Sequence, residues 1–230
     1  MKEMILFSGG PDALIAWEYL KRPTAFYIQH GCKYEEKQLR AVSKLQNMVQ
    51  SDKIRVRQSV LDLGDIEEED SFLPMRNMFF VMIVAGLGFD KIWLALQRGE
   101  QSIPDRSAGF TRRMSEELSI QLKRPITVDS PFWQMTKSDM VAWYIEHGHD
   151  VGILKETVSC FHPTLDRCGE CAACFRRWCA FESNGIHEEY TNDITKWSGI
   201  QEYIKKMQAG EYEERRTQQT LEFLEKEGLL

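Results

Sequence analysis

The stretch Met4-Ile5-Leu6-Phe7-Ser8-Gly9-Gly10-Pro11-Asp12-Ala13-Leu14 decides the fold of this 230-residue chain. Its apolar start predicts a buried strand, and Ser8-Gly9-Gly10 predicts a sharp turn into an amphipathic helix. The glycines let the backbone approach an anion closely, and the N–H groups of the turn, with the positive end of the helix dipole, suit phosphate or pyrophosphate. The stretch lacks Gly-x-x-x-x-Gly-Lys, so it is not a Walker-type loop. An ordinary strand-to-helix corner with no ligand is the alternative.

Composition narrows the class of protein. Apolar residues make up 43% of the chain and charged residues 28%, values typical of a soluble globular protein. The formal net charge of -6 weighs against nucleic acid as the partner, although a local basic groove is compatible with it. No segment resembles a signal peptide, and no apolar run approaches the roughly 20 residues of a membrane span. We therefore expect a cytoplasmic protein without a membrane partner.

Strand-like and helix-like segments alternate after the opening loop. The apolar patterns predict strands over residues 24–28, 54–60, 91–96 and 126–129, and helices over 34–49, 78–87, 111–122 and 137–147. The segment 78–87 is so apolar that we expect a buried helix. This alternation predicts an α/β fold in which helices cover both faces of a mostly parallel sheet. The long polar connection over 97–110 follows a strand, where ligands of such sheets bind.

Four of the six cysteines are gathered in one segment, Cys160 and Cys168-Gly169-Glu170-Cys171-Ala172-Ala173-Cys174. In a reducing compartment, such a cluster indicates metal ligation rather than disulfides. Four thiolates suit a closed tetrahedral zinc site with a structural role. An iron–sulfur cluster and unligated buried thiols are the alternatives. We expect the two remaining cysteines, Cys32 and Cys179, to be small buried hydrophobes rather than nucleophiles.

The loop and the cysteine cluster together carry a family resemblance. Ser8, Gly9, Gly10 and Asp12 match the SGGxDS loop of the PP-loop ATP pyrophosphatases, and Ala13 replaces the last serine. With the cluster included, the chain resembles the 7-cyano-7-deazaguanine synthase (QueC-like) family from about Met4 to Phe181. The further matching motifs are Pro74-Met75-Arg76-Asn77, Pro104-Asp105, Pro131-Phe132, Thr136-Lys137, Ser159-Cys160, and Arg177 with Phe181.

The resemblance implies a fold and a division of the chain. It implies a three-layer, parallel-sheet PP-loop fold, similar to the adenine nucleotide alpha hydrolases, with a C-terminal zinc-binding helical region. We expect a nucleotide-binding α/β domain over 1–150, a zinc-binding region over 151–187 and a helical extension over 188–230. The apolar residues of this extension are expected to pack on the domain or on a second subunit, as in a homodimer.

The resemblance also implies an activity. Members of the family use ATP to adenylate the carboxylate of 7-carboxy-7-deazaguanine. Ammonia then displaces AMP to give an amide, and a second activation dehydrates the amide to the nitrile, in queuosine-type 7-deazaguanine biosynthesis. The implied protein is therefore an ATP-dependent carbon–nitrogen ligase.

Site residues follow from the matching positions. The residues implied in ATP binding are Phe7, Ser8, Gly9, Gly10, Pro11, Asp12, Ala13 and Leu14. Asp12 is expected to act through Mg²⁺, since a carboxylate otherwise repels phosphates. Arg76 and Lys137 are expected to neutralise phosphate charge, with plain structural ion pairs as the alternative. Arg76, Asn77 and Asp105 are the expected substrate-binding residues, and Cys160, Cys168, Cys171 and Cys174 the zinc ligands.

Three departures from the family pattern leave other functions open. Ala13 removes a hydroxyl from the loop, Gly31-Cys32-Lys33-Tyr34 stands where Gly-Gln-Arg-His is typical, and Asp105 is followed by Arg106-Ser107 rather than Cys-Arg. A divergent PP-loop protein that adenylates another acceptor is one alternative. A catalytically impaired module that binds a nucleotide or a deazaguanine is the other.

Overall fold

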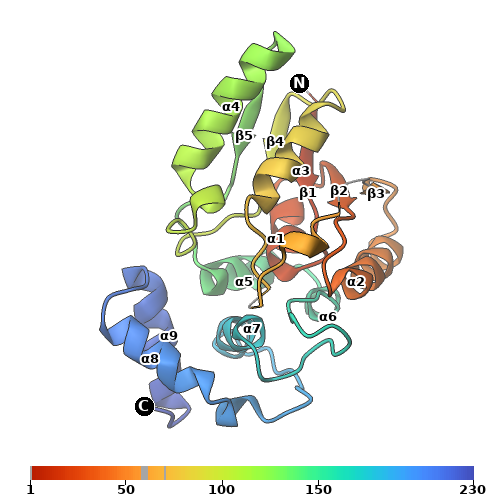
Figure 1. Ribbon diagram of the computed structural model, residues 1–230. Helices are drawn as coiled ribbons and strands as arrows, with labels where there is room; N and C mark the ends of the chain where they lie inside the picture. The colour runs from red at the N-terminus through yellow and green to blue at the C-terminus, as the bar shows by residue number, and fades with distance from the viewer. Residues whose placement is uncertain (1, 58–61, 70) are drawn as a thin grey trace.

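Five parallel strands form one sheet in the computed structural model, which describes residues 2–57, 62–69 and 71–230 (Figure 1). The strands are β1 (Glu3–Leu6), β2 (Thr24–Ile28), β3 (Ile54–Arg57), β4 (Lys91–Trp93) and β5 (Thr127–Asp129). Their order is β3-β2-β1-β4-β5, and Ile5 of β1 lies opposite Ala25 of β2 and Trp93 of β4. The chain therefore reverses its direction of winding at β1, where sheets of this kind open a crevice for ligands.

Helices cover both faces of the sheet. They are α1 (Pro11–Tyr19), α2 (Glu35–Met48), α3 (Arg76–Ala85), α4 (Ala108–Leu122), α5 (Lys137–Glu146), α6 (Val151–Lys155), α7 (Ala172–Glu182), α8 (Gly199–Gln208) and α9 (Glu214–Lys226), with short 3₁₀ turns at Gly64–Ile66, Pro104–Arg106 and Ile194–Lys196. Because side chains alternate along a strand, Ile5 packs with α1, α2 and α5, whereas Met4 packs with α3 and α4. The expected three-layer α/β fold is thus confirmed.

Two expectations about the elements need correction. The helix over 78–87 is not buried on all sides, since α3 buries Val81 and Val84 but leaves Met82 51% exposed. The fourth strand was expected over 91–96, but β4 ends at Trp93, where the chain turns toward the polar connection. For the third strand, expected over 54–60, β3 covers Ile54–Arg57, and residues 58–60 lie outside the described part of the chain. Val56 is 47% exposed because β3 is an edge strand. An edge strand has no neighbour to cover its outer side, so alternation alone overstates its burial.

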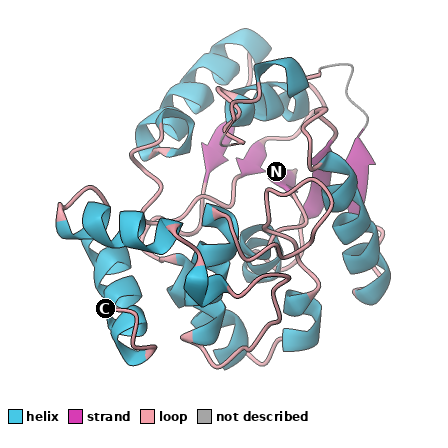
Figure 2. Cartoon of the chain, turned by 60° about the horizontal axis from the view of Figure 1, so that its bottom comes forward, coloured by secondary structure: helices cyan, strands magenta, loops and turns pink. Residues whose placement is uncertain are grey.

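The last third of the chain forms a separate apolar core. Side chains of α7, α8 and α9 pack together there, among them Phe175, Trp178, Ile204 and Phe223. Three of the cluster cysteines are buried in the same core. These helices lie beyond the ends of the strands where α1 and α5 begin, as Figures 1 and 2 show. Within the described residues, no helix is both long enough and apolar enough to cross a membrane.

Candidate active site and cysteine cluster

The loop after β1 has the geometry of a phosphate-binding turn. Gly9 has a φ of +74°, and a Cβ atom on it would lie 3.1 Å from Val42 Cγ2 and 3.3 Å from the Gln38 carbonyl oxygen. Only glycine fits this position without strain. Gly10 is the N-cap residue of α1 and offers no side-chain cap, so the first turn of the helix leaves its positive end available to an anion.

Asp12 and Lys137, which were expected to act at the same phosphate site in separate roles, are brought into contact from distant segments. The Lys137 Nζ donates to Asp12 Oδ1, and Gln97 Nε2 lies 3.4 Å from Asp12 Oδ2. Lys137 is the first residue of α5, whose start is fixed by a capping box between Thr136 and Asp139. A plain structural ion pair was the alternative role for Lys137. The lysine does form an ion pair, and its partner is a residue of the loop itself. This places a cation beside the expected phosphate site.

Two cavities meet at the loop. The first, which we call the strand-end cavity, has a volume of about 170 Å³ and lies at the carboxyl ends of β1, β2 and β4. The second, the loop cavity, also has about 170 Å³ and lies between the loop, α5 and the segment around Ser159. Ser8, Asp12 and Arg76 line both. A ligand could therefore extend from the strand ends, along the loop, to Lys137.

Arg76 faces both cavities and forms no ion pair within the described part of the chain. It begins α3 directly after Met75, which adopts a left-handed conformation with a φ of 58°. Among the described residues, no carboxylate lies within 4.0 Å of its guanidinium. A cation left without a counterion inside a polar cavity suits a bound anion.

Asn77 and Asp105 are joined to each other. Asp105 Oδ2 accepts from the Asn77 backbone N–H at 3.0 Å, and the Asn77 side-chain amide donates to the Asp105 carbonyl at 3.0 Å. Both residues are buried, but only Asn77 lines the strand-end cavity. The Asp105 carboxylate thus caps the start of α3 and positions Arg76 indirectly. Its direct contact with substrate remains a prediction.

His30 is a cavity residue that sequence reasoning missed. It follows β2 by two positions and lines the strand-end cavity, buried against Phe80. Its Nδ1 lies 2.9 Å from the Ile28 carbonyl oxygen, which can only accept, so Nδ1 carries the proton. Burial lowers the pKa of His30, and its Nε2 has no partner among the described residues. The available signal was its place at the carboxyl end of a predicted strand.

Glu100, Arg106 and Arg176 were also missed. Glu100 and Arg106 pair at 3.0 Å and line both cavities, and Arg176 of α7 lines the loop cavity. Burial raises the pKa of Glu100, but the charges of Arg106, Lys137, Arg176 and Arg216 outweigh it, so the pKa lies below its ordinary value. Glu100 lies in the long polar connection after β4, which was expected to meet ligands. Nothing in the sequence around Arg176 pointed to a cavity.

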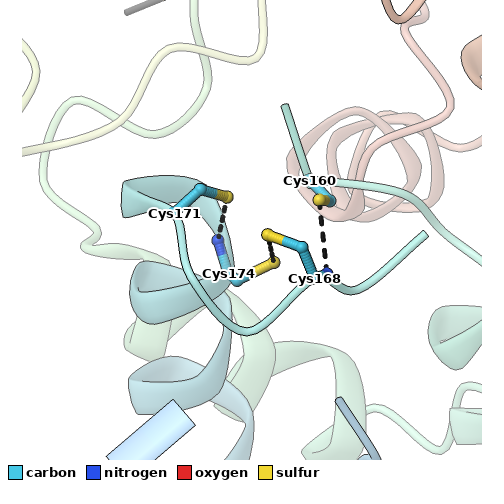
Figure 3. Close-up of side chains that lie close together, drawn as sticks. All are labelled: Cys160, Cys168, Cys171 and Cys174. Carbon is cyan, nitrogen blue, oxygen red and sulfur yellow. Dashed lines mark hydrogen bonds between the residues drawn. The ribbon is translucent and has the colours of Figure 1, made fainter. Parts of the chain in front are cut away.

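The four clustered cysteines converge as predicted (Figure 3). Their Sγ atoms all lie within 4.8 Å of one another, and those of Cys168 and Cys174 are 3.8 Å apart. Backbone N–H groups donate to three of the sulfurs at 3.3–3.5 Å, those of Cys160, Cys168 and Cys171. Side-chain hydrogen bonds with Cys160 and Cys174 lower the pKa of Cys171. This donor set can hold a metal ion.

Cys32 and Cys179 lie apart from the cluster, as expected. Both are buried, and burial raises the pKa of Cys32 to about 11. Burial raises the pKa of Cys179 as well. Thiols that resist ionisation in apolar surroundings are poor nucleophiles, which agrees with their expected role as packing residues.

Comparisons with known proteins fit this geometry. The family profile of the queuosine biosynthesis protein QueC matches residues 42–185, a stretch that includes α3, Lys137 and all four cluster cysteines. A protein of Porphyromonas gingivalis named 7-cyano-7-deazaguanine synthase is 25% identical over 227 residues, covering 85% of this chain and 97% of the relative.

Two further relatives bear similar names. A 7-cyano-7-deazaguanine synthase of Persephonella marina is 31% identical over 129 residues, covering 51% of this chain and 55% of the relative. The 7-cyano-7-deazaguanine synthase 2 of Sulfurisphaera tokodaii is 27% identical over 225 residues, covering 83% of this chain and 48% of the relative. The family match spans more than half of the chain and contains the four cluster cysteines, Arg76 and Lys137, while the loop at Ser8–Asp12 precedes it. The chain belongs to the queuosine biosynthesis protein QueC family.

Proposed function

We propose that this protein converts 7-carboxy-7-deazaguanine and ammonia to 7-cyano-7-deazaguanine at the expense of ATP. Support comes from family membership and from the names of relatives aligned over most of the chain. The single structural observation that carries the proposal is the meeting of two cavities at Asp12 and Arg76, with Lys137 paired to Asp12 in the loop cavity. One cavity has the place of a nucleotide site in a parallel sheet, and the other has the cations that phosphates require.

The chemistry needs activation rather than a protein nucleophile. A carboxylate is a poor electrophile, whereas AMP leaves readily from an acyl adenylate. The acceptor carboxylate attacks the α-phosphorus of ATP and releases pyrophosphate, and ammonia then displaces AMP to give the amide and a proton. The amide oxygen attacks the α-phosphorus of a second ATP and releases a second pyrophosphate, and loss of AMP and of both N–H protons then leaves the nitrile. The protein contributes mainly alignment and charge stabilisation.

Roles for the residues follow from where they lie. Residues Phe7 to Leu14 would hold the phosphates against the uncapped start of α1. Lys137 would stabilise charge on the departing pyrophosphate, and Arg76, which has no carboxylate partner in the described part of the chain, would do so from the opposite wall. Asn77 lines the strand-end cavity, where it would contact ATP, the substrate that we place at the strand ends. Closely placed cations of this kind stabilise the negative charge that develops in the transition state.

Two metals belong to the proposal. Cys160, Cys168, Cys171 and Cys174 would hold a structural Zn²⁺, because four convergent thiolates leave no position for a reacting water. The Asp12 carboxylate, which faces both cavities, would hold Mg²⁺, an ion that neutralises phosphate charge. Asp12 would exchange its contact with Lys137 for such an ion.

A second function is favoured by one residue. Ala13 lines the strand-end cavity where a serine hydroxyl is typical of this loop, so the site lacks one donor to a phosphate oxygen. A protein that binds a nucleotide or a deazaguanine without turnover would need no such donor.

Product analysis distinguishes the two functions. The purified protein is incubated with ATP, Mg²⁺ and ammonium, with and without 7-carboxy-7-deazaguanine. We expect AMP and pyrophosphate only when the acid is present, and the nitrile as final product. The Asp12→Asn variant should lose at least tenfold in turnover but still fold, with a smaller effect on thermal unfolding than on turnover, and Asp193→Asn, on the surface, serves as the control. Acid-independent AMP formation, or none at all, contradicts the proposal.

A further inference from the structure

A third cavity, which we call the tail cavity, lies between the connection after β4 and the C-terminal helices. Its volume is about 210 Å³, and its walls come from residues 97–106, the start of α5, and helices α7, α8 and α9. Five of its lining residues are basic and one is acidic, namely Arg98, Arg106, Lys137, Arg176, Arg216 and Glu100. In a chain with a formal net charge of -6, this concentration of cations indicates a site for an anion.

Three of the five cations are already neutralised. Arg98 pairs with Glu213 at 2.6 Å, Arg106 pairs with Glu100 at 3.0 Å, and Lys137 pairs with Asp12. The other two, Arg176 and Arg216, have no carboxylate within 4.0 Å in the part of the chain that the structure describes.

The contacts of these two arginines are to neutral groups. Arg176 donates to the Tyr203 hydroxyl at 3.2 Å, and Arg216 donates to the Gly99 carbonyl at 3.1 Å. Burial and the positive charge of Arg176 lower the pKa of Arg216, whereas the negative charge of Glu100 acts on both arginines in the opposite direction. Because Glu100 is already paired with Arg106, an anion in the cavity that Arg176 and Arg216 both line could still accept charge-assisted hydrogen bonds from them.

The remaining wall is aromatic. Tyr203 and Tyr212 stack with ring centroids 5.6 Å apart and an interplanar angle of 7°, and Phe175 lies 4.9 Å from Tyr203. All three line the cavity. Flat aromatic walls beside paired guanidiniums suit a planar ring that carries an acidic group.

The tail cavity borders the reaction centre. Glu100, Arg106, Lys137 and Arg176 line both the tail cavity and the loop cavity. A molecule bound between Arg176 and Arg216 would therefore lie next to the cation that touches Asp12. This is where an acceptor must wait for an activated phosphate.

The wall of the tail cavity that α8 and α9 form lies outside the segment that matches the family profile. The match ends at residue 185. Tyr203 on α8, Tyr212 in the turn after α8, and Arg216 on α9 all follow it. The tail therefore supplies binding groups that the matched segment lacks.

We propose that the tail cavity is the acceptor pocket, in which Arg176 and Arg216 hold the carboxylate of a planar heterocyclic acid. Helices α8 and α9, which we call the tail, set the specificity of this pocket. This rests on the proposed function, because the acid in question is the one activated at the loop. The tail then acts as a specificity element rather than as a passive extension.

Direct binding tests the proposal apart from turnover. Titration calorimetry measures the Kd of 7-carboxy-7-deazaguanine for the full chain saturated with the non-hydrolysable analogue α,β-methylene-ATP. We expect Arg216→Ala and Arg176→Ala each to raise this Kd at least tenfold. For Arg216→Ala, the Kd of the ATP analogue should stay within twofold of wild type. Arg216→Lys, which keeps the charge, should lose less, and Lys226→Ala, on the exposed side of α9, should change nothing.

The outcomes separate the pocket from the activity. An unchanged Kd for the acid in a folded Arg216→Ala variant overturns the proposal. So does a variant that loses affinity for inorganic pyrophosphate but keeps its affinity for the acid. AMP formation with an unchanged KM for the acid in that variant contradicts the pocket and leaves the proposed function standing. Tight, Arg216-dependent binding of the acid without any AMP formation supports the pocket and contradicts the proposed function.

Discussion

Ala13 shows how much of the phosphate site depends on the backbone. It is 3% exposed, lines the strand-end cavity and carries no hydrogen-bonding side chain. The neighbouring groups that can hold an anion are the N–H groups of the turn at Gly9 and Gly10 and the uncapped start of α1. Backbone donors are fixed by the fold, so they contribute without loss of side-chain entropy.

Replacement of Ala13 by Ser should tighten ATP binding. A hydroxyl at this buried position would add one charge-assisted hydrogen bond, worth up to about 1.5–3 kcal/mol, less the cost of fitting an oxygen beside apolar neighbours. We expect a fall of threefold to tenfold in the Kd of ATP, measured by calorimetry, while wild type still forms AMP. Ala108→Ser, at the exposed start of α4, is the matched control. Weaker ATP binding by Ala13→Ser would show that no phosphate oxygen lies near this position.

His30 should make stability depend on pH. Burial lowers its pKa in the folded protein below the value of about 6.5 in the unfolded chain. Below pH 6.5 the unfolded state therefore binds more protons, and the free energy of unfolding falls as pH falls, by at most about 1.4 kcal/mol per pH unit. The fall ends once the pH is below the folded-state pKa.

Urea unfolding of wild type and His30→Gln between pH 7 and pH 5 measures this effect. The wild-type free energy of unfolding should fall more steeply than that of the variant, since the carboxylates titrate in both. His187→Gln, at an exposed site, should keep the wild-type slope. Parallel curves for wild type and His30→Gln would contradict a neutral, buried imidazole.

At the scale of elements, α7 is held in place by a buried ion pair. Arg177 is 1% exposed and forms two hydrogen bonds with the Glu188 carboxylate, at 2.6 and 2.8 Å. It also donates to the Thr157 hydroxyl at 2.8 Å, and its guanidinium lies 4.2 Å from the centre of the Phe181 ring. One arginine thus ties α7 to the segment after α6 and to the segment that follows α7.

Arg177→Met should destabilise the protein strongly. Loss of Arg177 leaves the buried Glu188 carboxylate with Arg167 alone, at 3.0 Å, so the cost should approach but not exceed the roughly 3–5 kcal/mol of a fully unpaired buried charge. The double variant Arg177→Met, Glu188→Leu should recover part of this loss, because it removes the buried carboxylate and leaves only the partly exposed Arg167 without its partner. Arg40→Met, which breaks an exposed pair with Glu36, should cost less than about 1 kcal/mol. Urea unfolding gives these values, and equal losses for the single and double variants would contradict the argument.

The contrast between β2 and α7 explains how far sequence reasoning reaches. β2 was predicted with its observed bounds, since an apolar run between polar segments is a local signal. The bounds of α7 were not predicted, because its first residues serve the cysteine cluster and Arg177 interrupts its apolar face. The family resemblance placed Asp12 and Lys137 at one site, but their ion pair was not predicted, because 125 positions separate the two residues. The tail cavity requires a tertiary arrangement that no local pattern encodes.

At the scale of the whole molecule, the cysteine cluster links the sheet to the tail. Cys160 belongs to the segment that lines the loop cavity, whereas Cys174 lies on α7, which packs with α8 and α9. Lys37 of α2 adds a second tie, since its Nζ donates to the His162 and Leu165 carbonyls between the two ends of the cluster. A metal at the cluster would therefore fix the position of the tail relative to the loop.

Cys171→Ser should release the metal and loosen the tail. We expect one zinc per chain in wild type and little in the variant, measured by mass spectrometry of the metal, because binding energy at such a site is also folding energy. Proteolysis should then cut residues after 160 first, and acceptor binding should weaken more than ATP binding, since the tail cavity depends on α8 and α9. Cys32→Ala, at a buried cysteine outside the cluster, should keep its metal. Visible absorption from iron and sulfide in anaerobically purified protein would rule out zinc, and an unchanged metal content in Cys171→Ser would rule out the cluster as the site.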